Sequence, residues 1–283
     1  MSILKVTMAA GAALVIASAS VYAQAPSAYR APRTDGGHPD LNGIWQVLSE
    51  ANFDLEAHVA RPAMQTRPGP YGPVPAKEVL ALGAVGAVPP GMGVVEGGTI
   101  PYLPAALKKR DENRDHWITS DPDIKCFLPG VPRATYEPLP FQIFENANTV
   151  FIAYEYAGAV RNIYMKDPGP APVDSWMGQS VGHWEGDTLV VDVTGMNEDS
   201  WLDRSGNYHS DKLHVVERYT RTSPDVISYE ATLTDPDTFS RPWKISMPLY
   251  RRQEKNVQLM DFKCAEFVEE LMYGKWRKKP LDP

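Results

Sequence analysis

The stretch Trp184–Arg221 reads WEGDTLVVDVTGMNEDSWLDRSGNYHSDKLHVVERYTR, and it contains two runs of alternating side chains separated by a polar loop. The first run is Thr188–Thr194 and the second is Leu213–Arg221. Alternation with a period of two is typical of strands that cover a core with one face. The loop is rich in turn residues and carries Asp199, Asp203, His209 and Asp211. This stretch therefore predicts two strands of a sheet with a polar loop between them.

One residue of the second run does not suit its face. Glu217 shares a face with three apolar residues, Leu213, Val215 and Tyr219. A carboxylate that points into a core is either paired or protonated. Arg161 is misplaced in the same way, since it shares a face with Ile163 and Met165. We therefore predict a buried Glu217–Arg161 ion pair, whose role is either structural or functional.

The rest of the chain predicts further strands, most of them joined in pairs by tight turns. They are Ile44–Leu48, Phe141–Glu145, Val150–Tyr156, Val160–Met165, Val181–Trp184, Val226–Thr234, Trp243–Arg251 and Val257–Phe262. Strands at this spacing favour an antiparallel meander that forms a barrel or a sandwich, and they do not favour βαβ units. The expected fold class is therefore mainly β, with an irregular N-terminal half and a few short helices.

The N-terminal half is irregular because Arg61–Pro104 contains nine prolines and many glycines. Such a segment wraps the surface of a domain or, if it is mobile, acts as a lid. Short helices are expected at Ala76–Leu82, from Ala105 to about His116, and at Ala265–Tyr273. We expect residues 24–135 and the β-rich residues 136–283 to form one folded unit.

The first 23 residues have the pattern of a signal peptide. Lys5 is followed by an apolar run, Val6–Ser20, and then by Val21-Tyr22-Ala23, a small-x-small cleavage pattern. The run is short for a membrane span, so cleavage after Ala23 is expected, and a retained anchor is the alternative. The mature protein is then periplasmic or secreted, with no stable membrane insertion.

Composition and motifs exclude several classes of function. The net charge is −7, and no basic stripe is present that would attract nucleic acid. The chain lacks the Gly-x-Ser-x-Gly elbow of α/β-hydrolases, a P-loop, a dinucleotide-binding fingerprint and Cys-x-x-Cys-His. No cofactor is therefore expected, and a small molecule is the expected partner. The sequence does not indicate the oligomeric state.

The candidate site combines the ion pair with histidines. His209 and His214 are the expected proton carriers, since histidine titrates near neutral pH. Glu217 is the expected partner acid or base, and Arg161 would stabilise negative charge. The candidate substrate-binding residues are Arg133, Tyr136, Tyr154, Tyr156, Tyr164 and Trp176. These aromatic side chains would line an apolar pocket, unless they serve only as core packing.

Three functions are consistent with these residues. The leading hypothesis is an enzyme, of the lyase, dehydratase or isomerase type, that acts on a small apolar or aromatic molecule by general acid–base chemistry. The second is a non-catalytic protein that holds a hydrophobic ligand. The third is a metal-dependent hydrolase built on His209, Asp211 and His214, although their spacing matches no standard ligand signature, so no metal is expected.

Several runs resemble a large group of exported bacterial proteins, most of them recorded as hypothetical proteins. They are Lys125–Arg133 (KCFLPGVPR), Trp184–Asp192 (WEGDTLVVD), His209–Arg218 (HSDKLHVVER) and Arg241-Pro242-Trp243. The resemblance covers most of the mature chain and implies family membership without implying an activity. Gly43-Ile44-Trp45 is separately similar to the first strand of lipocalin-like barrels, in which the indole closes one end.

The chain contains two cysteines, Cys126 and Cys264. In an exported protein such a pair usually forms a disulfide, and two buried thiols are the alternative. A disulfide here would tie the middle of the chain to its C-terminal part, and in the chain-entropy model it would stabilise the fold by about 4–5 kcal/mol.

We predict that protein isolated without reductant contains the Cys126–Cys264 disulfide. Peptide mapping by mass spectrometry should then recover one linked peptide pair, which disappears after reduction. Quantitative alkylation of both cysteines in the unreduced, denatured protein would contradict this prediction.

Overall fold

The computed structural model describes residues 29–61, 66–75 and 88–262. The expected signal peptide, the helices expected at Ala76–Leu82 and Ala265–Tyr273, and Cys264 lie outside these residues and stay predictions. Within the described ranges, no helix is both long enough and apolar enough to cross a bilayer.

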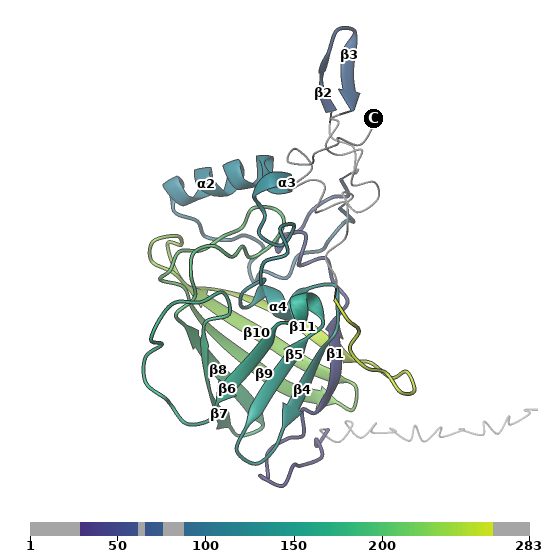
Figure 1. Cartoon of the computed structure of the whole chain (residues 1–283), viewed down its shortest axis with the longest axis vertical. Coiled ribbons are helices and arrows are strands. Elements are labelled where there is room, and N and C mark those ends of the chain that lie inside the picture. Colours follow the sequence, from purple (N-terminus) through teal and green to yellow (C-terminus); the bar gives the residue numbers. More distant parts are fainter. Residues whose placement is uncertain (1–28, 62–65, 76–87, 263–283) are drawn as a thin grey trace, which may run out of the picture.

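Nine strands close into a barrel in the order β1-β11-β10-β9-β8-β7-β6-β5-β4 (Figure 1). Their bounds are β1 Gly43–Val47, β4 Phe141–Glu145, β5 Val150–Tyr154, β6 Val160–Tyr164, β7 Gln179–Glu185, β8 Thr188–Thr194, β9 His214–Ser223, β10 Val226–Thr234 and β11 Trp243–Arg251. The expected mainly-β fold is confirmed, and of its two forms the chain adopts the barrel. Short connections join β4 to β5, β5 to β6, β7 to β8 and β9 to β10, as the alternation indicates.

One pairing differs from an antiparallel meander. Strands β6 and β7 are parallel, and they are joined by only two residue pairs, Ile163↔Ser180 and Tyr164↔Val181. The reason is the connection 165–178, which returns along the wall instead of turning tightly. Ser175 pins it to the end of β8 through backbone hydrogen bonds with Gly195 and Asn197 (2.9 and 3.0 Å). The barrel is therefore mixed, with a short joint at this position.

The strand expected at Val257–Phe262 was wrong, because the structure has no regular element there. The free side of β11 is occupied by β1, with Trp45 opposite Arg251 and Val47 opposite Leu249. Since β1 also pairs with β4, the sheet closes and offers no edge to another strand. The Val257–Phe262 segment instead reaches β5, where the Met260 amide donates to Glu155 Oε2 (2.9 Å).

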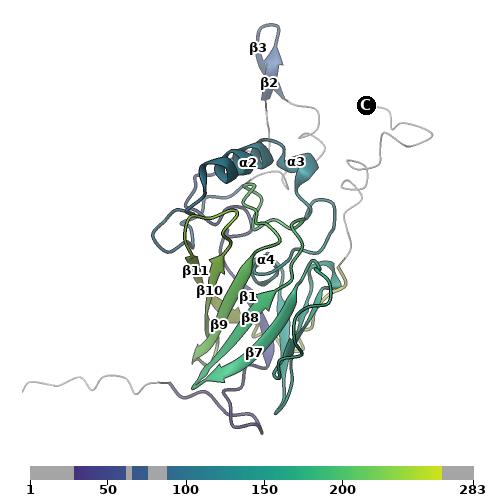
Figure 2. The same cartoon turned by 90° about the vertical axis from the view of Figure 1, so that its left-hand side faces the viewer.

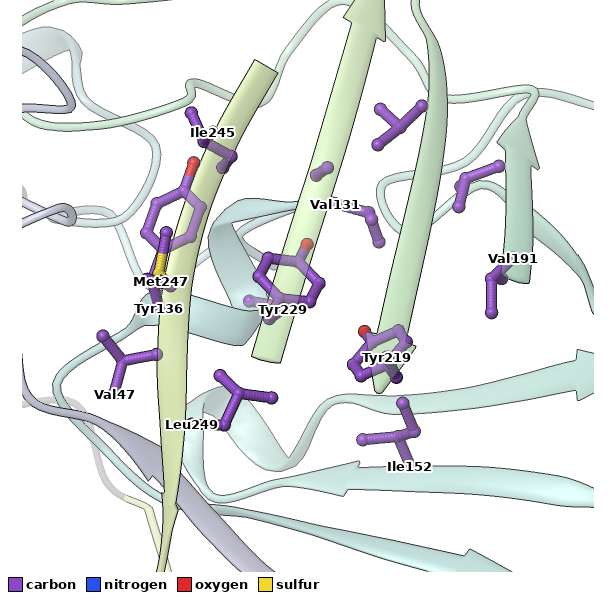
Figure 3. Packing of buried hydrophobic residues seen from close by; sticks show 14 of the residues in the cluster. Val47, Val131, Tyr136, Ile152, Val191, Tyr219, Tyr229, Ile245, Met247 and Leu249 are labelled. Carbon is purple, nitrogen blue, oxygen red and sulfur yellow. The ribbon is translucent and has the colours of Figure 1, made fainter. Parts of the chain in front are cut away.

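The barrel interior is packed with side chains. Every second residue of each long strand is buried, as the pattern iBiBiBiBi of β10 shows, and these residues form one cluster. Figure 3 shows Tyr219 and Tyr229 with Ile152, Val191 and Leu249 among the packed side chains. The close packing of such residues provides most of the hydrophobic stabilisation of the fold.

One end of the barrel is covered by a layer of loops and short helices (Figure 1). The helices are α2 Pro104–Asp115, α3 Trp117–Ser120, α4 Arg133–Tyr136 and the 3₁₀ helix η2 Tyr156–Gly158. The ribbon formed by β2 Thr66–Gly69 and β3 Gly72–Pro75 extends beyond this layer. The irregular N-terminal half is confirmed, and the helix expected from Ala105 to about His116 is present as α2, which begins one residue earlier at Pro104.

The other end of the barrel is crossed by the N-terminal segment 33–42 (Figure 2). Arg33 forms an ion pair with Asp187 (2.8 Å), and the Leu41 amide donates to Glu145 Oε2 (3.0 Å). Trp45 is fully buried just beyond this segment, and its indole N–H donates to the Leu41 carbonyl (2.9 Å). We call this end the lower mouth of the barrel.

Candidate functional site

The predicted ion pair lies inside the barrel. Arg161 Nη1 donates to Glu217 Oε1 at 3.2 Å, and Nη2 makes a second, short hydrogen bond with Oε2. The Arg161 and Glu217 side chains are 2% and 0% exposed. Arg161 Nε also donates to Ser180 Oγ (2.7 Å), which links β6 to β7 across their short joint. The expected Glu217–Arg161 pair is confirmed.

Two phenols complete the environment of the carboxylate. Tyr219 and Tyr229 each donate from the hydroxyl to Glu217 Oε1 (2.9 Å in both cases). Burial raises the pKa of both phenols well above their usual value, so both remain protonated donors. Burial alone would lower the pKa of Arg161, but Glu217 raises it well above its usual value. Arg161 therefore remains a cation. Glu217 Oε1 accepts three hydrogen bonds, from Arg161, Tyr219 and Tyr229.

Tyr154 borders this ion pair, with Arg161 and Thr135 close to its hydroxyl. It is buried, and burial raises its pKa although the Arg161 charge acts in the opposite direction. Among the described residues, its hydroxyl makes no hydrogen bond of ordinary geometry, and neither does that of Thr135. A buried polar group of this kind is costly unless water or a ligand completes its bonding.

A pocket lies on the barrel wall where β6, the connection 165–178 and the start of β7 meet. Its volume is about 250 Å³, and Arg161 and Ser180 are its most deeply buried polar lining residues. Its rim carries two exposed apolar residues, Val160 (58%) and Val173 (73%), together with the exposed polar residue Asn162. Tyr164, one of the expected substrate-binding residues, also lines it. We call this opening the lateral pocket.

His209 lies in a different place, in the loop layer, and is 1% exposed. Its Nδ1 lies 2.8 Å from the Ser210 carbonyl, which can only accept, so Nδ1 carries the proton and donates it. Ser200 Oγ then donates to His209 Nε2 (2.8 Å). Burial lowers the pKa of His209, so the ring is neutral near pH 7. The Ser200 partnership was not expected, since no sequence motif marks it.

His214 lies on the outer face of the barrel. Its side chain is 43% exposed and its Nε2 is 3.1 Å from Asp192 Oδ1. Glu217 is three positions further along the same strand and therefore points to the opposite face. Of the four expected catalytic residues, the structure brings together Arg161 and Glu217 and does not place His209 or His214 beside them.

The expected aromatic pocket is also divided. Tyr136 belongs to the loop layer, where its hydroxyl donates to the Leu202 carbonyl (2.7 Å). The Tyr156 hydroxyl donates to the Asp123 carbonyl (2.9 Å), and Trp176 stacks on Phe127 with ring centres 5.1 Å apart. Only Tyr154 and Tyr164 of this set lie at the ion pair or the lateral pocket, because Tyr136 and Tyr156 belong to the short helices α4 and η2 and Trp176 belongs to the connection 165–178.

Arg133 forms the centre of a second buried cluster. Its guanidinium donates to both oxygens of Asp121 (2.8 and 3.1 Å) and through Nε to Asn52 Oδ1 (2.8 Å). Asp123 and Glu137 lie within 3.4 and 3.3 Å of it. Arg133 is fully buried and so cannot contact a substrate from solvent. We call these residues the Arg133 cluster.

The Arg133 cluster contains more acid than base. Burial raises the pKa of Glu137 well above its ordinary value of 4.5, and the nearby charge of Asp123 adds to the rise. Burial also raises the pKa of Asp121, although Arg133 opposes the shift. Four polar atoms of this region lack a described hydrogen-bond partner, Asn52 Nδ2, Asp123 Oδ1, Glu137 Oε1 and Arg204 Nε. Glu137 is therefore the carboxyl that retains a proton most readily.

The proposed metal ligands do not assemble. His209 has both ring nitrogens in hydrogen bonds, and Asp211 is exposed and paired with Lys212 (2.7 Å). Among the residues that the structure describes, no group of three or more His, Cys, Asp or Glu side chains is arranged to hold a metal ion. The geometry therefore gives no support to the metal-dependent hydrolase.

No family model matches the chain, and neither a curated protein nor a solved structure matches it. The resemblance to exported bacterial proteins therefore stays a prediction. The function has to be inferred from the geometry of the sites.

We predict that Glu217→Gln destabilises the protein by about 3–5 kcal/mol, because it leaves the Arg161 charge buried without a counter-ion. The double variant Arg161→Met/Glu217→Leu should recover much of this loss, since neither remaining side chain is charged. The free energies of unfolding can be measured in guanidinium chloride.

The matched control is Glu185→Gln, which removes the partner of Arg218 on the outer face of the same sheet (2.9 Å, exposed). Solvent screens that pair, so little change is expected. A loss for Glu217→Gln that is no larger than the control, or a double variant less stable than either single one, would contradict the prediction.

We predict that Glu137→Gln flattens the dependence of stability on pH. The raised pKa of Glu137 means that its contribution to folding is complete below about 4.5, the ordinary value, and is lost as the pH rises through the folded-state value. The wild-type free energy of unfolding should therefore fall more steeply from pH 5 to pH 8 than that of the variant. Parallel profiles, with exposed Glu198→Gln as control, would refute this.

Proposed function

We propose that this protein binds a small molecule with an apolar part and a hydrogen-bonding group in the lateral pocket. The single observation that carries the proposal is the combination of exposed apolar rim residues with the buried polar groups of Arg161 and Ser180. Small-molecule sites are typically apolar concavities with a few polar groups that fix orientation.

Arg161 has hydrogen-bonding capacity left for a ligand. A guanidinium carries five N–H donors, and the described hydrogen bonds of Arg161 to Ser180 and Glu217 use three of them. A carbonyl, carboxylate or hydroxyl oxygen on the ligand would fit these donors.

We do not expect the ligand to bind inside the barrel, although barrels with an internal cavity can hold a ligand there. The interior is filled by large buried side chains, among them Trp45, Tyr219 and Tyr229, which belong to one packed cluster. A lateral site at the joint of β6 and β7 leaves this packing intact. Binding at this site therefore costs no rearrangement of the core.

The ion pair supports binding better than it supports acid–base catalysis. Glu217 Oε1 already accepts hydrogen bonds from Arg161, Tyr219 and Tyr229, so it is poorly placed to remove a proton. His214 points away from it. The acid–base enzyme is kept as the second candidate because His209 Nε2 faces the Ser200 hydroxyl, as a base faces a nucleophile.

The proposed place of action is the periplasm or the exterior of the cell. The support is the basic residue, apolar run and small-x-small pattern of the first 23 residues.

We predict that Asn162→Trp abolishes ligand binding. Asn162 is exposed, lies on β6 and lines the lateral pocket, so an indole there fills the opening without entering the core. The protein is incubated with a small-molecule extract of bacterial cells and separated by dialysis. Retained and consumed compounds are then identified by mass spectrometry.

The matched control is Ser246→Trp, which adds the same indole to an exposed outer-face position on β11. Retention of a compound by the wild type and by the control, and its loss in Asn162→Trp, would support the proposal. Retention that survives Asn162→Trp, or no retention at all, would contradict it. Consumption of a compound that stops in His209→Ala would favour the enzyme instead.

A further inference from the structure

A second and larger pocket lies at the lower mouth of the barrel. Its volume is about 500 Å³, within the range of small-molecule sites. The turn between β4 and β5, the residues that follow β6, the end of β7 and the N-terminal segment all contribute to it. We call it the lower-mouth pocket, and its lining includes His38, Asn148, Val150, Met165, Lys166 and Trp184.

The lower-mouth pocket has an apolar and aromatic base. Val150 is buried, while Met165 and Trp184 are partly buried and pack against the barrel core. His38 from the N-terminal segment stacks on Trp184, with ring centres 4.7 Å apart and the planes within 1° of parallel. The stack holds the indole in one orientation at the edge of the core, where a flat apolar ligand would contact it.

Two basic residues of the lower-mouth pocket, Lys166 and His38, have side-chain nitrogens without a described partner, whereas His183, which also lines it, lies 3.3 Å from Glu185. Lys166 is exposed, and no described residue forms a hydrogen bond or ion pair with its ammonium group. The ring nitrogens of His38 likewise make no hydrogen bond within the described part of the chain. Asn148 adds an exposed side-chain amide.

None of the described residues that line this pocket is acidic, although the chain carries a net charge of −7. The two nearby glutamates have other partners. Glu145 accepts from the Leu41 amide (3.0 Å) and from Thr34 (3.3 Å). Glu185 forms an ion pair with Arg218 (2.9 Å) and lies 3.3 Å from His183 Nε2. The pocket is therefore a local exception to the acidic character of the protein, and it favours an anion.

We propose that the lower-mouth pocket is a second binding site and that its ligand is a small ring-containing carboxylate. The ring would pack on Val150, Met165 and Trp184, and the carboxylate would pair with Lys166 and accept a hydrogen bond from His38 or Asn148. A cation is disfavoured by Lys166, and an anion without a ring would leave the apolar base in water. The inference does not depend on the lateral pocket.

The test uses benzoate, cyclohexanecarboxylate and indole-3-acetate as probes. Dissociation constants are measured by isothermal titration calorimetry on the full-length protein, with benzamide as the uncharged counterpart and inorganic phosphate as the ringless anion. At least one ring carboxylate should bind more tightly than both comparison compounds. Lys166→Gln should weaken that binding about five- to tenfold, the effect of losing one partly screened charge pair.

Two further variants locate the site. Asn148→Glu introduces a negative charge at an exposed turn position of the pocket and should weaken binding at least as much as Lys166→Gln. Lys212→Gln makes the same change in charge in the loop 195–212 and should leave binding within about twofold, because exposed charges far from a site are screened. Thermal unfolding of each variant checks that it is folded.

Three results would overturn the inference. The first is the absence of binding for all three ring carboxylates. The second is equal weakening by Lys166→Gln and Lys212→Gln, which would indicate a nonspecific effect of net charge. The third is binding of phosphate or benzamide as tight as that of the ring carboxylates, which would remove the requirement for a charge combined with a ring.

Discussion

An arginine and a glutamate that have both lost contact with water hold the inner face of the barrel at the joint between β6 and β7. Each buried charge requires the other, because either one alone would lose several kcal/mol of solvation. Ser180, Tyr219 and Tyr229 each add one hydrogen bond to the pair. The network therefore determines which side chains of β6, β7, β9 and β10 point into the barrel.

Much of this arrangement follows from the alternation of residues along single strands. The parity of Glu217 and Arg161 predicts their inward direction, and opposite charges on the inside of one sheet predict the pair. The same parity places Tyr219 inward. The tight turn between β9 and β10 then sets Tyr229 opposite Tyr219. The hairpin register could therefore have predicted that Tyr219 and Tyr229 bind the Glu217 carboxylate, but only the ion pair was predicted from the sequence.

Other features depend on contacts that strand alternation does not encode. Ser180 reaches Arg161 only because β7 lies parallel to β6, and a long connection does not reveal that direction. The Ser200–His209 hydrogen bond joins two positions of an irregular loop, and the Arg133 cluster joins segments far apart in sequence. The strand expected at Val257–Phe262 failed for a related reason, since β1 had already taken the edge of β11. Closure of a barrel is a global property that local patterns do not report.

The joint between β6 and β7 contains only two residue pairs, so the barrel wall is regular everywhere except at this joint. Eight of the nine pairs of neighbouring strands are antiparallel. The connection 165–178 joins the two strands of the ninth pair, β6 and β7, which is parallel. Residues can be inserted or removed in that connection at little entropic cost, because loop closure depends weakly on length. The size and lining of the lateral pocket can thus change with this connection while the ring of strands stays the same.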